Sequence, residues 1–209
     1  MLKLNFKNIA FIMICIYTVG ALGHLYPSLK PLFLILTPYN LVLTLALYLV
    51  LNSIKLKDIP LLALIFSIGF FIEVIGVKTG LLFGVYKYGD SLGFKWLDVP
   101  LVIGLNWVLL NFIGYGIVTK YVKNIILKSS LAALHIVLMD ILIEPIAIQL
   151  DYWTWQNNEI PLQNYVMWFI VSFSIQLIIN YSKLRIDFKS SLLMLSLQLL
   201  FFTVLNLVL

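Results

Sequence analysis

Seven long runs of apolar residues constrain what this chain can fold into. Each run has about 20 residues, the length that an α-helix needs to cross the hydrocarbon core of a bilayer. Backbone polar groups in lipid must find partners within the protein, and runs of this length without two-residue alternation indicate helices. The sequence therefore predicts an all-α, polytopic bundle of transmembrane helices, forming a single integral membrane domain over residues 1–209. The seven predicted spans are 8–26, 31–51, 59–76, 99–119, 129–150, 162–182 and 191–209.

The composition excludes most other classes of protein. Hydrophobic residues make up 62% of the chain and charged residues 11%, whereas a soluble domain is about half apolar and about a quarter charged. One cysteine allows no internal disulfide, and two histidines are too few for a three-histidine metal site. We interpret the first apolar run as a membrane span rather than a cleaved signal peptide.

The basic residues predict how the bundle is oriented. Of the 14 Lys and Arg residues, ten fall on the side of the N-terminus and four on the opposite side. Because Lys and Arg are enriched in cytoplasmic loops, we expect the N-terminus in the cytoplasm and the C-terminus at the outer face. The same bias explains the net charge of +5, since the basic residues are scattered singly. We therefore expect no nucleic-acid partner.

Three acidic residues lie inside predicted spans, where ionisable groups are costly and are usually functional or paired. A helix rises 1.5 Å per residue, which places Glu73, Asp140 and Glu144 at similar depths in the outer halves of the third and fifth spans. Asn106 of the fourth span reaches the same level. These positions predict one polar chamber that opens toward the outer leaflet, with His24, Thr37, Asn40 and Asn164 also at this depth.

Helical phase places Asp140, Glu144 and Asp151 on one face of the fifth span, whereas His135 points away from it. The alternative to a functional role for Asp140 and Glu144 is an interhelical contact that fixes packing. We favour function because two carboxyl groups are neighbours. For both histidines a structural or interfacial role is favoured, and for the asparagines of the spans the two interpretations remain open.

Two connections on the predicted outer side have an unusual composition. Residues 77–99 alternate glycine, aromatic and charged residues, which is typical of a folded lid or re-entrant segment, and residues 151–155 are rich in Trp and Tyr. Such aromatic residues also form belts at membrane interfaces. Their position beside carboxyl groups favours a role in stabilising a cation, since an aromatic face attracts positive charge.

Motifs for nucleotide binding, zinc binding and a Ser or Cys nucleophile are absent from the sequence. We therefore expect neither a cofactor nor a metal, and chemistry carried by carboxylic acids and water.

A set of motifs runs along the chain at residues 73–80, 83–88, 36–41, 99–100, 106–107, 140–145, 153–155 and 160–165 with Trp168. Taken together, these motifs resemble a carotenoid biosynthesis membrane family that contains carotenoid 1,2-hydratases and bisanhydrobacterioruberin hydratase. The resemblance covers nearly the whole chain. Residues 156–159 depart from the family pattern, which has a glycine and an aromatic residue there, and this loop is a place where substrate preference can differ.

This resemblance implies a hydro-lyase in a bacterial or archaeal cytoplasmic membrane. The enzyme would add water across the terminal carbon–carbon double bond of an acyclic or monocyclic carotenoid, without a cofactor. Membrane lipid surrounds such an enzyme, and other carotenoid enzymes are candidate partners. We expect Glu73, Asp140 and Glu144 to be catalytic, with Glu144 or Glu73 as the general acid and Asp140 as its partner for water. The expected substrate-binding residues are Asn40, Lys78, Tyr86, Tyr88, Asn106, Trp107, Asp151, Trp153, Trp155 and Asn164.

Other functions use the same residues. A proton-initiated cyclase or isomerase of isoprenoids would use these acids but leave the mass of its product unchanged. A proton-coupled transporter also needs acids inside the membrane, although seven spans without a visible repeat do not favour the inverted halves common in carriers. A scaffold for a carotenoid-making complex would tolerate neutralisation of every acid.

Overall fold

The computed structural model of the protein describes residues 5–182 and 184–209. Seven of its helices are long and apolar enough to cross a membrane, so the chain is a multi-pass membrane protein and the predicted all-α class is confirmed. Lys3 and Lys183, which contribute to the predicted orientation, lie outside the described residues. The spans are α1 (Phe6–Leu25), α2 (Lys30–Leu51), α3 (Ile59–Thr79), α4 (Leu101–Thr119), α5 (Ile125–Gln149), α6 (Leu162–Tyr181) and α7 (Phe188–Val208).

Local capping residues explain two of the differences between the structure and the predicted span boundaries. Helix α5 begins four residues earlier than predicted because Asn124 caps it, accepting a hydrogen bond of 2.9 Å from the backbone N–H of Leu127. Asp187 caps α7 in the same way through the N–H of Ser190, at 2.9 Å. In these two helices the apolar run shows the membrane-spanning core, and the polar cap extends the helix beyond it.

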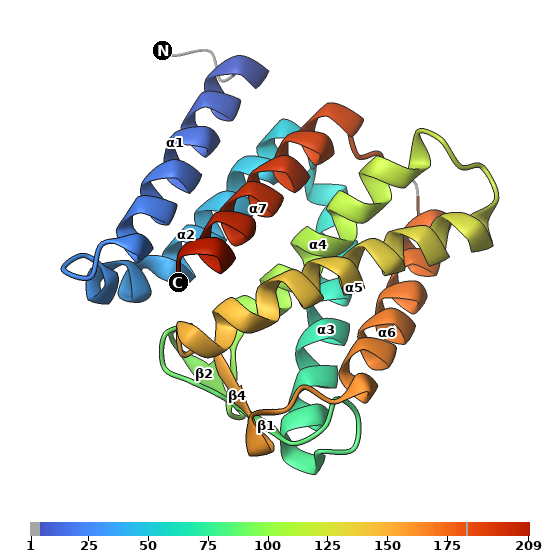
Figure 1. The fold of residues 1–209 in the computed structure, drawn as a ribbon. Helices are drawn as coiled ribbons and strands as arrows, with labels where there is room; N and C mark the ends of the chain where they lie inside the picture. Colours follow the sequence, from blue (N-terminus) through green and yellow to red (C-terminus); the bar gives the residue numbers. More distant parts are fainter. Residues whose placement is uncertain (1–4, 183) are drawn as a thin grey trace.

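Helix α4 is the centre of the bundle. It contacts α2, α3, α5, α6 and α7, and it is the most buried of the seven spans (Figure 1). Helix α1 packs against α2 and α7 at the edge of the molecule. Lipid-facing helix surfaces are as apolar as the core, so hydropathy alone did not distinguish the central helix from the peripheral ones.

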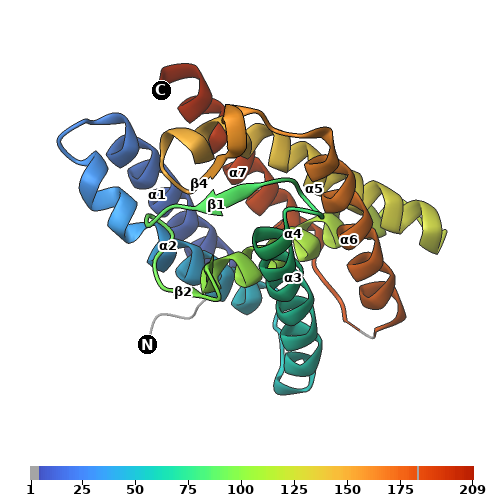
Figure 2. The same cartoon turned by 90° about the horizontal axis from the view of Figure 1, so that it is seen from below.

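Two short antiparallel ribbons close one end of the bundle (Figure 2). Strand β1 (Tyr86–Tyr88), which follows α3, pairs with β4 (Trp153–Trp155), which follows α5. Strand β2 (Lys95–Trp96) pairs with β3 (Val99–Pro100), and single turns of 3₁₀-helix form η1 (Leu56–Asp58) and η2 (Gln156–Asn158). The segment of residues 77–99 is folded, as its composition suggested. Its pairing with the connection after α5 was not predicted.

A buried polar network joins α4, α5 and α6 toward the opposite end of the bundle. The side-chain amide of Gln176 donates hydrogen bonds to the backbone oxygen of Asn111 at 2.8 Å and to its side-chain oxygen at 3.1 Å. One turn further along α6, Asn180 donates to Ser129 of α5 at 3.1 Å. Interhelical hydrogen bonds of this kind help to hold helices together where no hydrophobic effect drives them.

We predict that Gln176→Leu lowers the thermal stability of the purified protein. The substitution keeps the side-chain volume but removes the Gln176 donor from the Asn111 oxygens. This loss costs about 1 kcal/mol of stability and lowers the midpoint temperature of thermal unfolding by about 2–4 °C. Ser174→Ala is the matched control, since Ser174 is exposed on the same helix and bonds only the Ile170 carbonyl of its own helix among the described contacts. Equal melting temperatures for the two variants would contradict this role.

Candidate active site

Three carboxyl groups face one small cavity beneath the β1–β4 ribbon. Glu73 comes from α3 and Asp140 and Glu144 come from α5, and each is at most 3% exposed. The cavity of about 30 Å³ has room for one or two water molecules, since a single water requires about 10–15 Å³. We call it the acid cavity. The rest of its wall is formed by Tyr86, Tyr88, Ile103, Asn106, Leu110, Ile143, Trp153, Trp155, Asn164 and Trp168.

The two acids of α5 share one neighbour on α6. Asp140 and Glu144 are four residues apart, so their side chains leave the helix on the same face. The Asn164 amide donates to Asp140 Oδ2 at 2.8 Å and to Glu144 Oε1 at 3.3 Å. Asn164 therefore fixes the spacing of the pair from the side of α6.

Glu73 is held by three ring donors. The hydroxyl groups of Tyr86 and Tyr88 donate to its Oε2, the latter at 2.8 Å, and the Trp107 indole donates to its Oε1 at 3.1 Å. Burial raises the pKa of Tyr86 and Tyr88 well above the ordinary value, and the neighbouring Glu73 charge raises it further. Both phenols therefore keep their protons and remain donors.

Glu144 is held by the second strand of the same ribbon. The indole groups of Trp153 and Trp155 both donate to Glu144 Oε2 at 2.9 Å. Alternate residues of a strand point to one face, so the patterns Tyr-Lys-Tyr and Trp-Thr-Trp direct all four aromatic rings to the same side. The register places Tyr86 opposite Trp155 and Tyr88 opposite Trp153, so one ribbon supplies donors to both glutamates.

Asp140 is in a different environment from the two glutamates. In the described part of the chain its carboxyl group accepts one hydrogen bond, from Asn164. The described residues that line the acid cavity include no Lys, Arg or His, so no cation neutralises the three carboxyl groups. Like charges this close and this buried repel strongly, so the cluster retains at least one proton.

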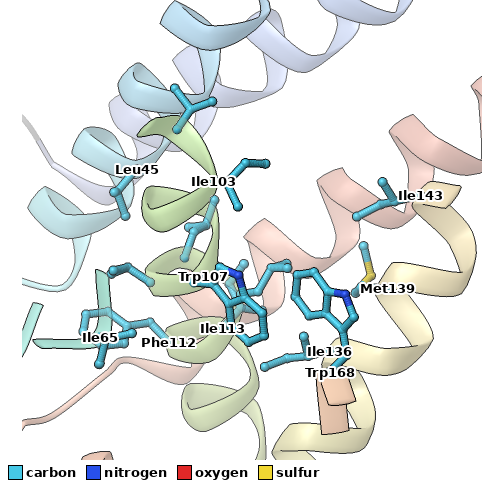
Figure 3. Packing of buried hydrophobic residues seen from close by; sticks show 14 of the residues in the cluster. Leu45, Ile65, Ile103, Trp107, Phe112, Ile113, Ile136, Met139, Ile143 and Trp168 are labelled. Atoms are coloured by element: carbon cyan, nitrogen blue, oxygen red, sulfur yellow. The ribbon is translucent and has the colours of Figure 1, made fainter. Parts of the chain in front are cut away.

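Trp107 supports the cavity from behind Glu73 rather than lining it. It is fully buried and stacks on Trp168 of α6, with ring centroids 4.1 Å apart (Figure 3). A Cβ atom on Gly69 of α3 would lie 2.3 Å from Trp107 Cγ, so glycine is required for this close approach. Trp168 follows Asn164 by one helical turn, and this spacing is the signal that would have added it to the predicted site.

Besides Trp107, the structure places three other predicted residues outside the acid cavity. Lys78 is exposed and pairs with Asp98, because it lies five residues after Glu73 and points from another face of α3. Asp151 is exposed beyond the end of α5, with φ of 55°, so the helical phase of that span does not extend to it. Asn40 lines a neighbouring cavity.

The single chamber expected from the depth of the polar residues is divided in two. Glu73, Asp140, Glu144 and Asn164 line the acid cavity, whereas a second cavity of about 90 Å³ is lined by His24, Thr37 and Asn40. Ile103 and Ile143 of the common wall were missed because in a sequence they resemble any core residue. The two cavities share Ile103, Asn106, Ile143 and Trp153.

A comparison with family models identifies the wider group. The model described as "Carotenoid biosynthesis protein" matches residues 30–209, which include every residue of the acid cavity. This chain belongs to the carotenoid biosynthesis protein family. Bisanhydrobacterioruberin hydratase of Haloarcula japonica is 30% identical to this family member over 109 residues, covering 47% of this chain. This chain spans only 36% of the length of that relative. No solved structure matches this chain.

The ribbon predicts different effects on stability for substitutions at two adjacent residues of this carotenoid biosynthesis protein. Tyr88→Phe removes a donor from buried Glu73 and should cost about 1–3 kcal/mol of stability. Lys87→Ala changes an exposed side chain on the other face of the same strand and should leave the melting temperature unchanged. Thermal unfolding of both variants tests the arrangement. A loss of stability in Lys87→Ala as large as in Tyr88→Phe would contradict it.

Proposed function

We propose that this carotenoid biosynthesis protein is a hydratase. It adds water across the terminal double bond of an acyclic carotenoid end group and forms a tertiary alcohol. The observation that carries the proposal is a water-sized cavity enclosed by three carboxyl groups and aromatic rings. The family supports a carotenoid substrate, and the name of the Haloarcula japonica relative supports a hydratase.

Asp140 is the general acid in this proposal. An isolated alkene is a weak base, so its protonation requires a neutral carboxylic acid held in a site with little water. Donors to a carboxylate favour its ionised form, and Glu73 and Glu144 each accept three hydrogen bonds against one for Asp140. The proton of the cluster therefore resides on Asp140. This reverses the roles expected from the sequence, in which the donors to each acid are not visible.

The reaction then proceeds through a tertiary cation. Asp140 transfers its proton to the less substituted carbon of the double bond, which forms a C–H bond and leaves the positive charge on the tertiary carbon. The faces of Trp153, Trp155 and Tyr86 and the charges of the glutamates stabilise this cation. Water in the acid cavity attacks it and forms the C–O bond. The proton that the water loses returns to the Asp140–Glu144 pair, so the cluster ends with the proton it had at the start.

Product analysis in a bacterium that makes lycopene or a monocyclic carotene tests the reaction. We expect a new carotenoid heavier by one water, which takes up oxygen-18 from labelled water and not from oxygen gas. A new product of unchanged mass would instead indicate a cyclase or isomerase. An unchanged carotenoid profile with both acyclic and monocyclic carotenoids would rule the proposal out.

Neutralising the proposed acid should abolish turnover without unfolding the protein. General acid catalysis contributes about 10²–10⁴-fold to a rate, so we expect Asp140→Asn to lower hydration by at least that factor. Glu144→Gln should also lose activity, because Glu144 receives the proton of the attacking water. Asp90→Asn is the matched control, since the Asp90 side chain is 99% exposed and pairs with Lys95 at the surface. Full activity of Asp140→Asn at wild-type expression would remove Asp140 from the mechanism.

A further inference from the structure

The second cavity shares wall residues both with the acid cavity and with a groove between α1 and α2. Asn106 and Trp153 belong to the walls of both cavities. On its other side, His24 and Asn40 also line a groove between α1 and α2. The outer part of this groove is apolar and includes the exposed side chain of Val19. A ligand that moves between the acids and the bilayer along this side of the bundle passes through the second cavity.

Two buried side chains present unpartnered acceptors to this cavity. His24 of α1 is 5% exposed and Gln198 of α7 is 4% exposed. His24 Nδ1 lies 2.8 Å from the Gly20 carbonyl, which only accepts, so Nδ1 carries the proton and Nε2 of the neutral ring has a lone pair. His24 Nε2 and Gln198 Oε1 themselves have no hydrogen-bond partner among the described residues. The rest of the Gln198 side chain interacts with the Tyr17 hydroxyl, which lines the same cavity.

The orientation of the His24 ring is fixed by packing. Its edge-on neighbours are Phe33 of α2 and Phe201 of α7, with centroid distances of 5.9 and 6.0 Å. The Nε2 lone pair is therefore held by the same contacts that join α1 to α2 and α7. A buried acceptor that lacks a donor is costly, so two such acceptors on residues of one cavity indicate a ligand that supplies an O–H or N–H group.

The remaining wall defines the rest of that ligand. The second cavity is lined by no Asp, Glu, Lys or Arg among the described residues, so a charged ligand would find no counter-ion there. Much of its wall is hydrocarbon, including Leu41, Ile143 and Phe202. The chemistry that fits is a neutral hydroxyl group on an apolar carbon skeleton.

We propose that the second cavity binds the hydroxylated end of an isoprenoid chain, whose hydroxyl donates to His24 Nε2 or Gln198 Oε1. The inference rests on the proposed hydratase function, because the alcohol formed at the acids carries such a hydroxyl. Asn106 and Trp153 line both cavities, so the proposed site adjoins the acid cavity where the alcohol forms. The α1–α2 groove adjoins the second cavity through His24 and Asn40, so the product can leave toward the lipid by that groove. The two acceptors give the new hydroxyl partners as the product leaves.

Binding of two ligands to the purified protein in detergent tests this assignment. The probes are an acyclic carotenoid and its 1-hydroxy derivative, with the dissociation constants measured by quenching of tryptophan fluorescence. In His24→Phe and Gln198→Leu we expect the dissociation constant of the alcohol to rise about tenfold and that of the hydrocarbon to change less than twofold. His135→Phe, which alters the other histidine of the chain outside both cavities, should change neither.

A conservative variant distinguishes the loss of the acceptor from a loss of folding. His24→Gln keeps an acceptor near the position of Nε2, so it should restore most of the affinity for the alcohol that His24→Phe loses. The proposal would be overturned if His24→Phe and Gln198→Leu weakened the binding of both ligands equally, or if neither changed the affinity for the alcohol. The two acceptors would then bind only water.

The hydration assay on the same proteins separates this inference from the proposed function. Hydrated product without selective loss of alcohol binding would refute the second site and leave the hydratase standing. Selective loss of alcohol binding in a protein that never forms hydrated product would refute the hydratase and leave a hydroxyl-binding site.

Discussion

The arrangement of the acid cavity depends on the hydrogen bonds from one short ribbon to two buried glutamates. Tyr86 and Tyr88 donate to Glu73, and Trp153 and Trp155 donate to Glu144. Buried carboxylates in a membrane are costly unless they are hydrogen-bonded. Because the four donors belong to two paired strands, the same contacts position α3 relative to α5 and cover the cavity with aromatic rings.

The unequal distribution of these donors gives chemically similar groups different roles. Glu73 and Glu144 receive the ring donors, whereas Asp140 shares one amide with Glu144. Environments that differ in this way allow neighbouring carboxyl groups to act as acid and as stabilising charge. In the proposed mechanism the second cavity continues this division, since water would bind beside the acids and the product hydroxyl would bind on the side of α1 and α7.

Much of the fold was predictable from the sequence, because a membrane requires helices of about 20 apolar residues. The depth and phase of Glu73, Asp140 and Glu144 also brought these acids together, since both follow from helix geometry. What the sequence did not show depends on contacts between distant segments. The pairing of β1 with β4 joins residues more than 60 positions apart, and the separation of His24 and Asn40 from the acids depends on apolar side chains such as Ile103 and Ile143. Asp151 was placed in the wrong environment because α5 ends two residues before it.

The central claim is that Asp140 delivers a proton to carbon before water is captured. The most direct measurement begins with product formed in heavy water. The product is then transferred to ordinary water, and its mass spectrum is recorded. The account predicts one deuterium retained on the carbon next to the tertiary alcohol, and no such product from Asp140→Asn. A hydrated product without carbon-bound deuterium, or one formed equally well by Asp140→Asn, would contradict it.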